Sequence, residues 1–242
     1  MQADRTPANT QVQAKRAFYR QPDIAGAYDA QRFGGVSGAH VNARELALVG
    51  ELLPFGGPIA DVACGTGRLT AALRQRGDIV LPCDASLAML RVAASHQVGP
   101  VVQADAFALP IADATCTGAV TLRVLFHFVE PGALLAELRR VVRPGGTLVC
   151  DTYSWSARSL FPLSRRRWGA TVSTVNRQRF RALANSLGWA VRAERPCFLV
   201  SPYIYRRLPL PFVLVLERLE RQLPSFLLCR AFWALEATAP RQ

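Results

Sequence analysis

Long apolar runs are missing from this 242-residue sequence. The longest run near the C-terminus, LPLPFVLVL at 208–216, is far shorter than the ~20 apolar residues that cross a bilayer. The N-terminal MQADRTPANTQVQAKR also lacks the apolar core of a secretion signal. These absences lead us to expect a cytoplasmic protein.

Closely spaced cysteines are missing as well. The six cysteines are scattered over the chain without a C-x-x-C pair, at positions 64, 83, 116, 150, 197 and 229. This pattern excludes a cysteine-based zinc site and a disulfide framework. We expect free thiols that are mostly buried, and no metal.

Lysine is almost absent, because Lys15 is the only one, so arginine carries the formal net charge of +12. A charge of this size favours acidic partners such as nucleic acid or anionic lipid headgroups. The arginines are spread along the chain, with one dense group at 165–167. Charge alone therefore does not select a partner.

The sequence does contain an alternation of strand-like and helix-like segments. Strands are expected at 59–63, 79–83, 100–104, 117–122 and 147–152, and helices at 43–53, 67–75, 86–95 and 131–142. A further helix, a strand, an amphipathic segment and a last strand at 227–238 follow. This order predicts an α/β fold: a doubly wound, Rossmann-like, mostly parallel seven-stranded sheet with helices on both faces.

The chain is expected to divide into an arm and one domain. Residues 1–40 would form an N-terminal arm, loose and polar over 1–20, in which Tyr28, Arg32 and Phe33 would suit a lid. Residues 41–242 would form a single domain, with a ligand-binding half at 41–152 and a second half at 153–242 that completes the sheet.

A glycine pair lies between the first strand and the next helix, in Asp61-Val-Ala63-Cys-Gly65-Thr66-Gly67. Two glycines here allow a ligand to approach the backbone. Dinucleotide-binding loops carry a third glycine where this chain has Thr70, and the Gly-Lys-Ser/Thr of a P-loop is absent. The pattern therefore favours neither NAD nor a nucleoside triphosphate.

The same loop resembles the first motif of the class I S-adenosylmethionine-dependent methyltransferases. Asp84 after the second strand, Asp105 in ADAFALP after the third, and the Pro144-Gly145-Gly146 turn before the fifth follow in that family's order. The resemblance covers residues 58–152 and is strongest to the small-molecule branch that includes quinone C-methyltransferases. It implies S-adenosyl-L-methionine as the cofactor.

The resemblance also implies roles for individual residues. Asp61 would support the loop and the cofactor's ammonium end, Asp84 would accept both ribose hydroxyls, and Asp105 would lie beside the adenine amino group. Exposed amides at the glycines can bind a carboxylate. The full predicted cofactor set is Tyr28, Asp61, Ala63, Gly65, Thr66, Gly67, Asp84, Ala85, Asp105, Ala106 and Arg123.

Methyl transfer is an in-line displacement that mainly needs alignment, and a base only where the acceptor must lose a proton. Three residues near the strand ends are candidates for contact with the acceptor or for catalysis: His127 after the fourth strand, and Asp151 and Tyr153 after the fifth. Each can also be read structurally, as a packed, capping or rim residue.

The acceptor is predicted to be a small, hydrophobic or aromatic molecule rather than nucleic acid. The Asn/Asp-Pro-Pro-Tyr loop of base-amine methyltransferases is replaced by Thr121-Leu122-Arg123-Val124. Apolar pockets suit such molecules, and aromatic residues are frequent after 152: Tyr153, Trp155, Phe161, Trp168, Phe198, Tyr203, Tyr205 and Phe212.

Two other functions stay open. One is an RNA or DNA methyltransferase that uses the arginines at 165–167, and the other is a non-catalytic, cofactor-binding regulator. The amphipathic stretch from Tyr205 to Trp233 can pack on the sheet, or contact the inner face of an anionic membrane as a peripheral protein. The sequence leaves the acceptor, the methylated atom and the oligomeric state undetermined.

Overall fold

A computed structural model of the protein describes residue 13 and residues 16–128, 130–156 and 172–239. The strands are β1 (Pro58–Val62), β2 (Ile79–Asp84), β3 (Val102–Gln103), β4 (Cys116–Thr121), β5 (Val142–Tyr153), β6 (Trp189–Cys197) and β7 (Arg230–Ala237). The helices are α2 (Pro22–Phe33), α3 (Gly35–Leu52), α4 (Arg68–Gln75), α5 (Leu87–Ser95), α6 (Gly132–Val141), α8 (Arg177–Ser186), α9 (Pro202–Tyr205) and α10 (Leu210–Glu220), with 3₁₀ turns at Leu125–His127 and Ser225–Leu227.

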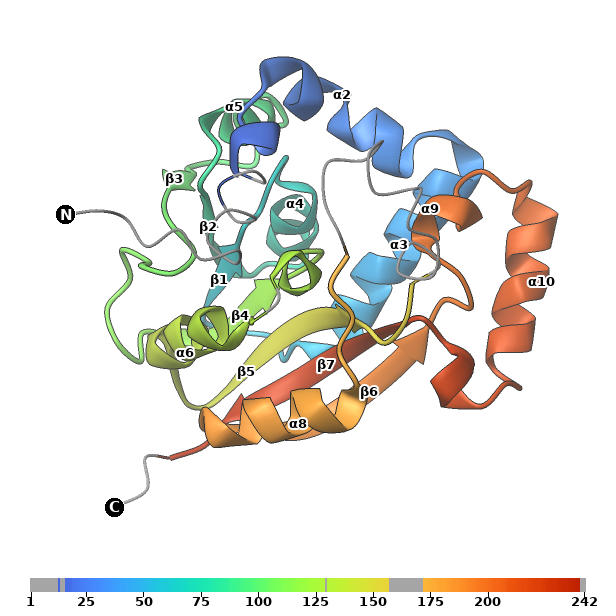
Figure 1. The fold of residues 1–242 in the computed structure, drawn as a ribbon. Coiled ribbons are helices and arrows are strands. Elements are labelled where there is room, and N and C mark those ends of the chain that lie inside the picture. Colours follow the sequence, from blue (N-terminus) through green and yellow to red (C-terminus); the bar gives the residue numbers. More distant parts are fainter. Residues whose placement is uncertain (1–12, 14–15, 129, 157–171, 240–242) are drawn as a thin grey trace.

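The strands form one seven-stranded sheet in the order β3-β2-β1-β4-β5-β7-β6 (Figure 1). The pairings among β1 to β5 are all parallel, whereas β7 runs antiparallel to both β5 and β6. The predicted Rossmann-like α/β fold and strand number are confirmed, and the sheet is mixed. Because the parallel strands point the same way, their carboxyl ends meet at one edge, where ligands bind in such sheets.

Two apolar layers hold the helices on opposite faces of the sheet. One face is covered by α6 and α8 (Figure 1). Their side chains, such as Leu135 and Phe180, pack in one buried cluster with Trp233 of β7. On the other face, α3, α4 and α10 pack side chains such as Val49 and Leu73 against the strands. All six cysteines are buried, with free thiols.

Several predicted boundaries move in the structure. The first helix is longer than expected, because α3 begins at Gly35 and follows α2 directly. The third strand shrinks to Val102–Gln103 at the sheet edge, where only β2 is available as a partner. The amphipathic stretch forms α10, and the expected last strand forms β7.

The expectation that residues 1–20 are loose is wrong for their described part. Residues 16–19 are helical and close over the sheet edge, where the Ser86 hydroxyl donates a hydrogen bond to the Tyr19 carbonyl at 2.6 Å. Two adjacent aromatic residues, Phe18 and Tyr19, give this turn an apolar side to bury. Among the described helices, none combines the length and apolarity that crossing a membrane requires.

Candidate functional site

A pocket, here the first pocket, opens at the carboxyl edge of β1, β2 and β4. It gathers residues that are distant in the sequence, from the N-terminal turn, the glycine loop, the β2 end and the loop after β3. Its lining includes most of the predicted cofactor residues: Tyr28, Ala63, Gly65, Asp84, Ala85, Asp105, Ala106 and Arg123. It also includes Arg16, Tyr19 and Arg20, which were not predicted, and His127.

The two glycines of the loop serve different purposes. Gly65 has a φ of +59°, and a Cβ built on it would meet no atom within 4 Å, so its backbone is open to a ligand. Gly67 caps α4 with a φ of +79°, and a Cβ there would lie 2.9 Å from Val98. Gly67 is therefore required for packing and helix initiation, whereas Gly65 faces the pocket.

Asp84 fastens the glycine loop to the end of β2. Its Oδ2 accepts a hydrogen bond from the Gly65 amide at 2.9 Å, and its Oδ1 accepts one from the Ser86 amide at 2.7 Å. Burial raises the pKa of this carboxyl, while these amides partly offset the rise. Each carboxylate oxygen keeps further acceptor capacity for a ligand hydroxyl at the pocket wall.

Asp105 lies at the outer rim of the first pocket. Its side chain is 41% exposed and forms a 2.6 Å ion pair with Arg16, which ties the N-terminal turn to the loop after β3. The same carboxylate accepts a hydrogen bond from the Phe107 amide at 3.1 Å. Ala106 lines the pocket beside it.

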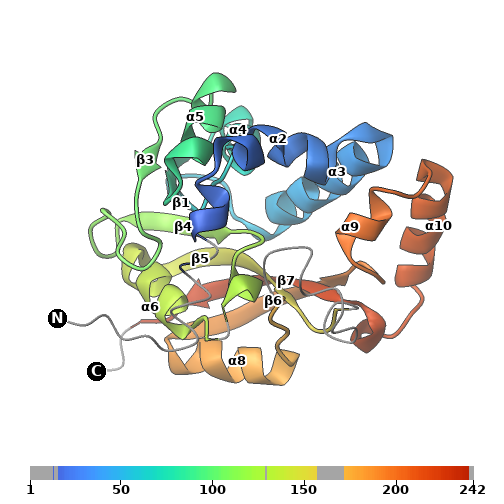
Figure 2. The ribbon, with the colours of Figure 1, turned by 45° about the horizontal axis from the view of Figure 1, so that its top comes forward.

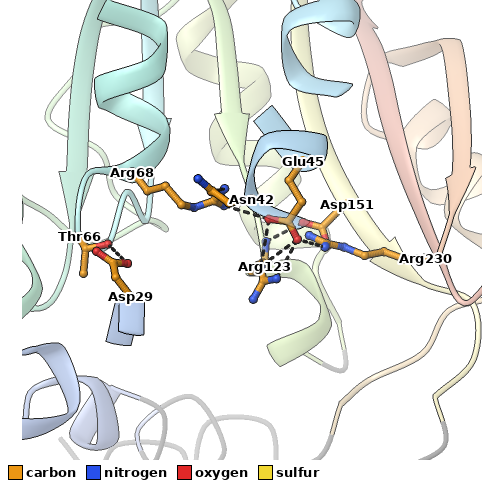
Figure 3. Close-up of polar contacts among 8 residues, drawn as sticks. All are labelled: Asp29, Asn42, Glu45, Thr66, Arg68, Arg123, Asp151 and Arg230. Carbon is orange, nitrogen blue, oxygen red and sulfur yellow. Dashed lines mark hydrogen bonds and ion pairs between the residues drawn. The ribbon is translucent and has the colours of Figure 1, made fainter. Parts of the chain in front are cut away.

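Asp61 and Thr66 lie behind the pocket wall, each 2% exposed. The Thr70 hydroxyl donates to Asp61 Oδ2 at 2.6 Å, so the residue that replaces a third glycine supports the loop's first aspartate. Burial raises the pKa of Asp61 to about 6. The Thr66 hydroxyl donates to Asp29 of α2 at 2.8 Å, which links the predicted arm to the loop (Figure 3).

A second pocket adjoins the first on the β5 side. Its lining combines aromatic rings, hydroxyls and two arginines: Phe18, Tyr19, Tyr28, Arg32, Arg123, Phe126, His127, Tyr153, Ser156, Val172, Ser201, Pro202 and Tyr203. Tyr19, Tyr28, Arg123 and His127 line both pockets and mark their junction. No acidic residue is among the described residues that line the second pocket.

The catalytic candidates take different places around these pockets. His127 lies at the junction, with its ring 4.6 Å from that of Phe126 and 6.1 Å from that of Tyr19. Tyr153 lines the second pocket, and burial raises its pKa to about 12, so its hydroxyl stays protonated at neutral pH. Asp151 lines neither pocket and is fully buried.

Asp151 instead belongs to a buried ion cluster that the sequence did not predict (Figure 3). Its Oδ1 accepts a hydrogen bond from the Arg123 amide at 2.6 Å, and its Oδ2 accepts one from Arg230 Nε at 2.7 Å. Glu45 of α3, fully buried, accepts bonds from Arg123 at 2.8 Å, from Arg68 at 3.1 Å and from Arg230. The cluster therefore holds both the backbone amide and the side chain of Arg123 in place.

The backbone is strained at two strand ends that line the first pocket. Ala63 after β1 has a φ of +58°, and Arg123 after β4 has a φ of +62°. Left-handed conformations are costly for residues with a Cβ and cluster at functional sites. Both positions were in the predicted cofactor set, although the sequence gives no sign of their strain.

The aromatic residues that were predicted to line an acceptor site do not all line one pocket. Tyr153 and Tyr203 line the second pocket, while Phe198 and Tyr205 are fully buried in the apolar core. Phe212 is 63% exposed on α10. Phe161, Trp168 and the arginines at 165–167 lie outside the described residues.

Comparison with known proteins points to one family. A family model for a methyltransferase domain matches residues 60–150. A demethylmenaquinone methyltransferase of Corynebacterium kroppenstedtii is 43% identical over 40% of this chain and 42% of its own length. A malonyl-[acyl-carrier protein] O-methyltransferase of Pseudescherichia vulneris is 36% identical over 65% of this chain and 61% of its own. The chain thus spans about half the length of these relatives.

Solved structures share the fold over nearly the whole chain. A geranyl diphosphate C-methyltransferase of Streptomyces coelicolor superposes with a TM-score of 0.68 at 14% identity, covering 98% of this chain and 100% of its own. A magnesium protoporphyrin IX methyltransferase of Synechocystis gives a TM-score of 0.65 at 14% identity, covering 94% and 100%. Both structures contain bound S-adenosylhomocysteine. Motif order, sheet topology and the matched domain agree: residues 60–150 match a methyltransferase domain, and the chain has the fold of the class I S-adenosylmethionine-dependent methyltransferases, which its sequence resembles.

Proposed function

We propose that this protein transfers a methyl group from S-adenosylmethionine, bound in the first pocket, to a small acceptor in the second pocket. The observation that carries the proposal is the shared wall of the two pockets, formed by Tyr19, Tyr28, Arg123 and His127. Adjoining sites allow donor and acceptor to be held in line, which is the main requirement of a displacement at an activated methyl group. When bound, the cofactor supplies that activated methyl group.

The residues of the first pocket suit a nucleoside with an amino-acid tail. Asp84 can accept hydrogen bonds from ribose hydroxyls, and Asp105 can accept one from an adenine amino group. Gly65 leaves open space beside Ala63 for the amino-acid end, while its own amide donates to Asp84. Arg16 and Tyr19 cover this site from the N-terminal turn, so we propose that the arm, including Tyr28, acts as a lid.

The second pocket suits an aromatic or apolar acceptor that carries or acquires negative charge. Arg32 lies 5.7 Å from the ring of Tyr28 and 5.9 Å from that of Tyr203, without a carboxylate partner among the described residues. Arg123 adds a second cation at the junction. Cations near a reacting oxygen stabilise its anionic form. A carboxylate or an ionised ring hydroxyl would both fit.

The two relatives illustrate these acceptor chemistries. One is named for demethylmenaquinone, whose reduced ring carries hydroxyl groups, and the other for a malonyl group, which carries a carboxylate. A carboxylate reacts as an anion without a base, whereas a ring hydroxyl must first lose a proton. We propose His127 as the base for the second case, because it lies at the junction of the pockets. Tyr153, protonated at neutral pH, would donate a hydrogen bond to the acceptor oxygen.

The test compares acceptors directly. The purified protein is incubated with radiolabelled S-adenosylmethionine and either a reduced demethylated naphthoquinone or a malonyl thioester, and the labelled product is quantified. Transfer to either acceptor supports the proposal, and loss of transfer in His127→Ala for the quinol alone supports the base. Tight cofactor binding without turnover on a broad acceptor panel would favour the non-catalytic alternative.

A further inference from the structure

The segment from α9 to the 3₁₀ turn after α10, residues 202–227, forms an exposed apolar surface. In both views α10 lies at the outer edge of the molecule, beside α9 (Figure 1 and Figure 2). Large apolar side chains that face solvent concentrate here: Ile204 at 40%, Phe212 at 63%, Leu214 at 48%, Val215 at 57%, Leu219 at 42%, Phe226 at 71% and Leu227 at 38% exposed. We call residues 202–227 the α10 surface.

The opposite side of the same helix is anchored to the body of the protein. Glu220 is 5% exposed and accepts hydrogen bonds from Tyr205, from Arg44 and from the Phe198 amide at 3.1 Å. Glu217 contacts His40 at 3.0 Å and Arg44 at 3.2 Å. Packing on the body therefore uses one face of α10 and leaves the apolar residues of the other face exposed.

The exposed charged residues of the α10 surface are all arginines. Arg207, Arg218 and Arg221 are exposed and Arg206 is partly exposed. The acidic residues of the segment, Glu217 and Glu220, are both engaged with α3. Exposed apolar side chains flanked by arginines, without free carboxylates, are typical of helices that lie in the headgroup region of an anionic membrane.

We propose that the α10 surface binds the face of an anionic lipid bilayer. Phe212, Val215 and Phe226 would enter the boundary between headgroups and acyl chains, while Arg218 and Arg221 contact lipid phosphates. A second copy of the chain is a weaker candidate for this surface, because pairing it with itself would bring like charges together. A membrane would bury the apolar side chains and also place lipid phosphates beside the arginines.

This docking would also place the second pocket near lipid. Pro202 and Tyr203, at the start of the α10 surface, line that pocket together with the preceding Ser201. A lipid-soluble acceptor could then reach the pocket from the bilayer, a consequence that rests on the proposed function. Membrane binding itself does not depend on catalysis, so it can be measured separately.

The experiment is co-sedimentation of the full chain with vesicles of phosphatidylcholine alone or mixed with phosphatidylglycerol, at low and high salt. We expect binding to the mixed vesicles that weakens with salt, because the arginine contacts are screened. The double variant Phe212→Ser/Val215→Ser should reduce the bound fraction by roughly tenfold, through the loss of inserted apolar area. Arg218→Gln/Arg221→Gln should reduce it at low salt.

The matched control is Ile79→Ser, which removes a 64% exposed apolar side chain at the start of β2, outside the α10 surface. This variant should bind vesicles like the wild type. Calorimetry with S-adenosylhomocysteine checks that all variants keep a folded first pocket. No binding to anionic vesicles at low salt would overturn the proposal, as would a dimer in light scattering that Phe212→Ser/Val215→Ser dissociates.

Discussion

The two pockets share a wall but differ in their acidic groups. The first pocket presents the carboxylates of Asp84 and Asp105 beside Arg16, Arg20 and Arg123, whereas the second presents the guanidinium groups of Arg32 and Arg123 and no carboxylate among its described residues. Acidic groups suit the hydroxyl and amino donors of a nucleoside. Cationic groups suit an acceptor oxygen that reacts as an anion. The polarity of each pocket thus matches one of the two proposed ligands.

The charged groups of the two pockets are also held in place by different partners. Asp84 is held by two backbone amides within its own loop region. Arg123 is held by Glu45 and by Asp151, which themselves share Arg230 (Figure 3). The cluster has three arginines against two carboxylates, a net formal charge of +1. Breaking this cluster should therefore have the largest effect.

Replacing Glu45 by Gln should destabilise the fold by about 3–5 kcal/mol, because it leaves buried arginines without their main counter-charge. Burial alone would raise the pKa of Glu45, but Arg123, Arg230 and Arg68 hold it well below its ordinary value. The carboxylate's stabilising contribution is thus present at neutral pH and lost as the pH falls toward that lowered pKa. Chemical denaturation measures the free energy of unfolding.

The matched control for Glu45 is Asp113→Asn, which breaks a pair with Arg140 at a side chain that is 78% exposed. Surface pairs contribute less than about 1 kcal/mol, so this variant should unfold almost like the wild type. Equal losses in both variants would contradict the role assigned to the cluster.

Asp61 should give the opposite dependence on pH. Its folded-state pKa is raised to about 6 by burial, above its ordinary value of 3.8. The native state therefore holds a proton that the unfolded state releases, and stability falls as the pH rises from about 4 through 6. Relative to Asp61→Asn, the wild type should lose roughly 3 kcal/mol across that range. Denaturation curves at a series of pH values test this, and parallel curves would contradict it.

On the cofactor side, Asp84→Ala should weaken binding of S-adenosylhomocysteine by roughly 1–3 kcal/mol, through lost bonds to a charged group. Asp105→Ala should cost less, because its carboxylate is 41% exposed and already pairs with Arg16. Isothermal titration calorimetry measures both. If Asp105→Ala lost more affinity for S-adenosylhomocysteine than Asp84→Ala, the pocket rim rather than the end of β2 would dominate recognition of the cofactor.

Most of the predicted cofactor residues line the first pocket, because the sequence signals that located them are local. Gly65 and Asp84 follow neighbouring strands whose order the alternation of elements gives, and parallel strand ends meet at one edge. The second pocket depends on contacts between distant segments, from Tyr28 of α2 to Tyr203 of α9. No spacing rule brings these residues together, so only single members, such as Tyr153, could be proposed.

The ion cluster shows why side-chain direction is hard to predict. Asp151 lies at the end of the expected fifth strand, and its position suggested contact with a ligand. It pairs instead with Arg230, 79 residues later in the chain, while Glu45 pairs with the same arginine across 185 residues. In the sequence Glu45 is an ordinary polar position in a helix. The aromatic pair Phe18-Tyr19 in a polar arm was the available signal for the turn that covers the first pocket.

The smallest expected effect concerns Arg32, whose guanidinium lies between the rings of Tyr28 and Tyr203. Arg32→Gln should raise the KM for an anionic acceptor by roughly tenfold, about the value of one partly exposed charged contact. The affinity for S-adenosylhomocysteine should stay unchanged, because Arg32 does not line the first pocket. Arg179→Gln, on the exposed side of α8, is the matched control and should alter neither value. An equal rise in KM for a neutral acceptor would mean that Arg32 acts by packing on the tyrosines rather than by its charge.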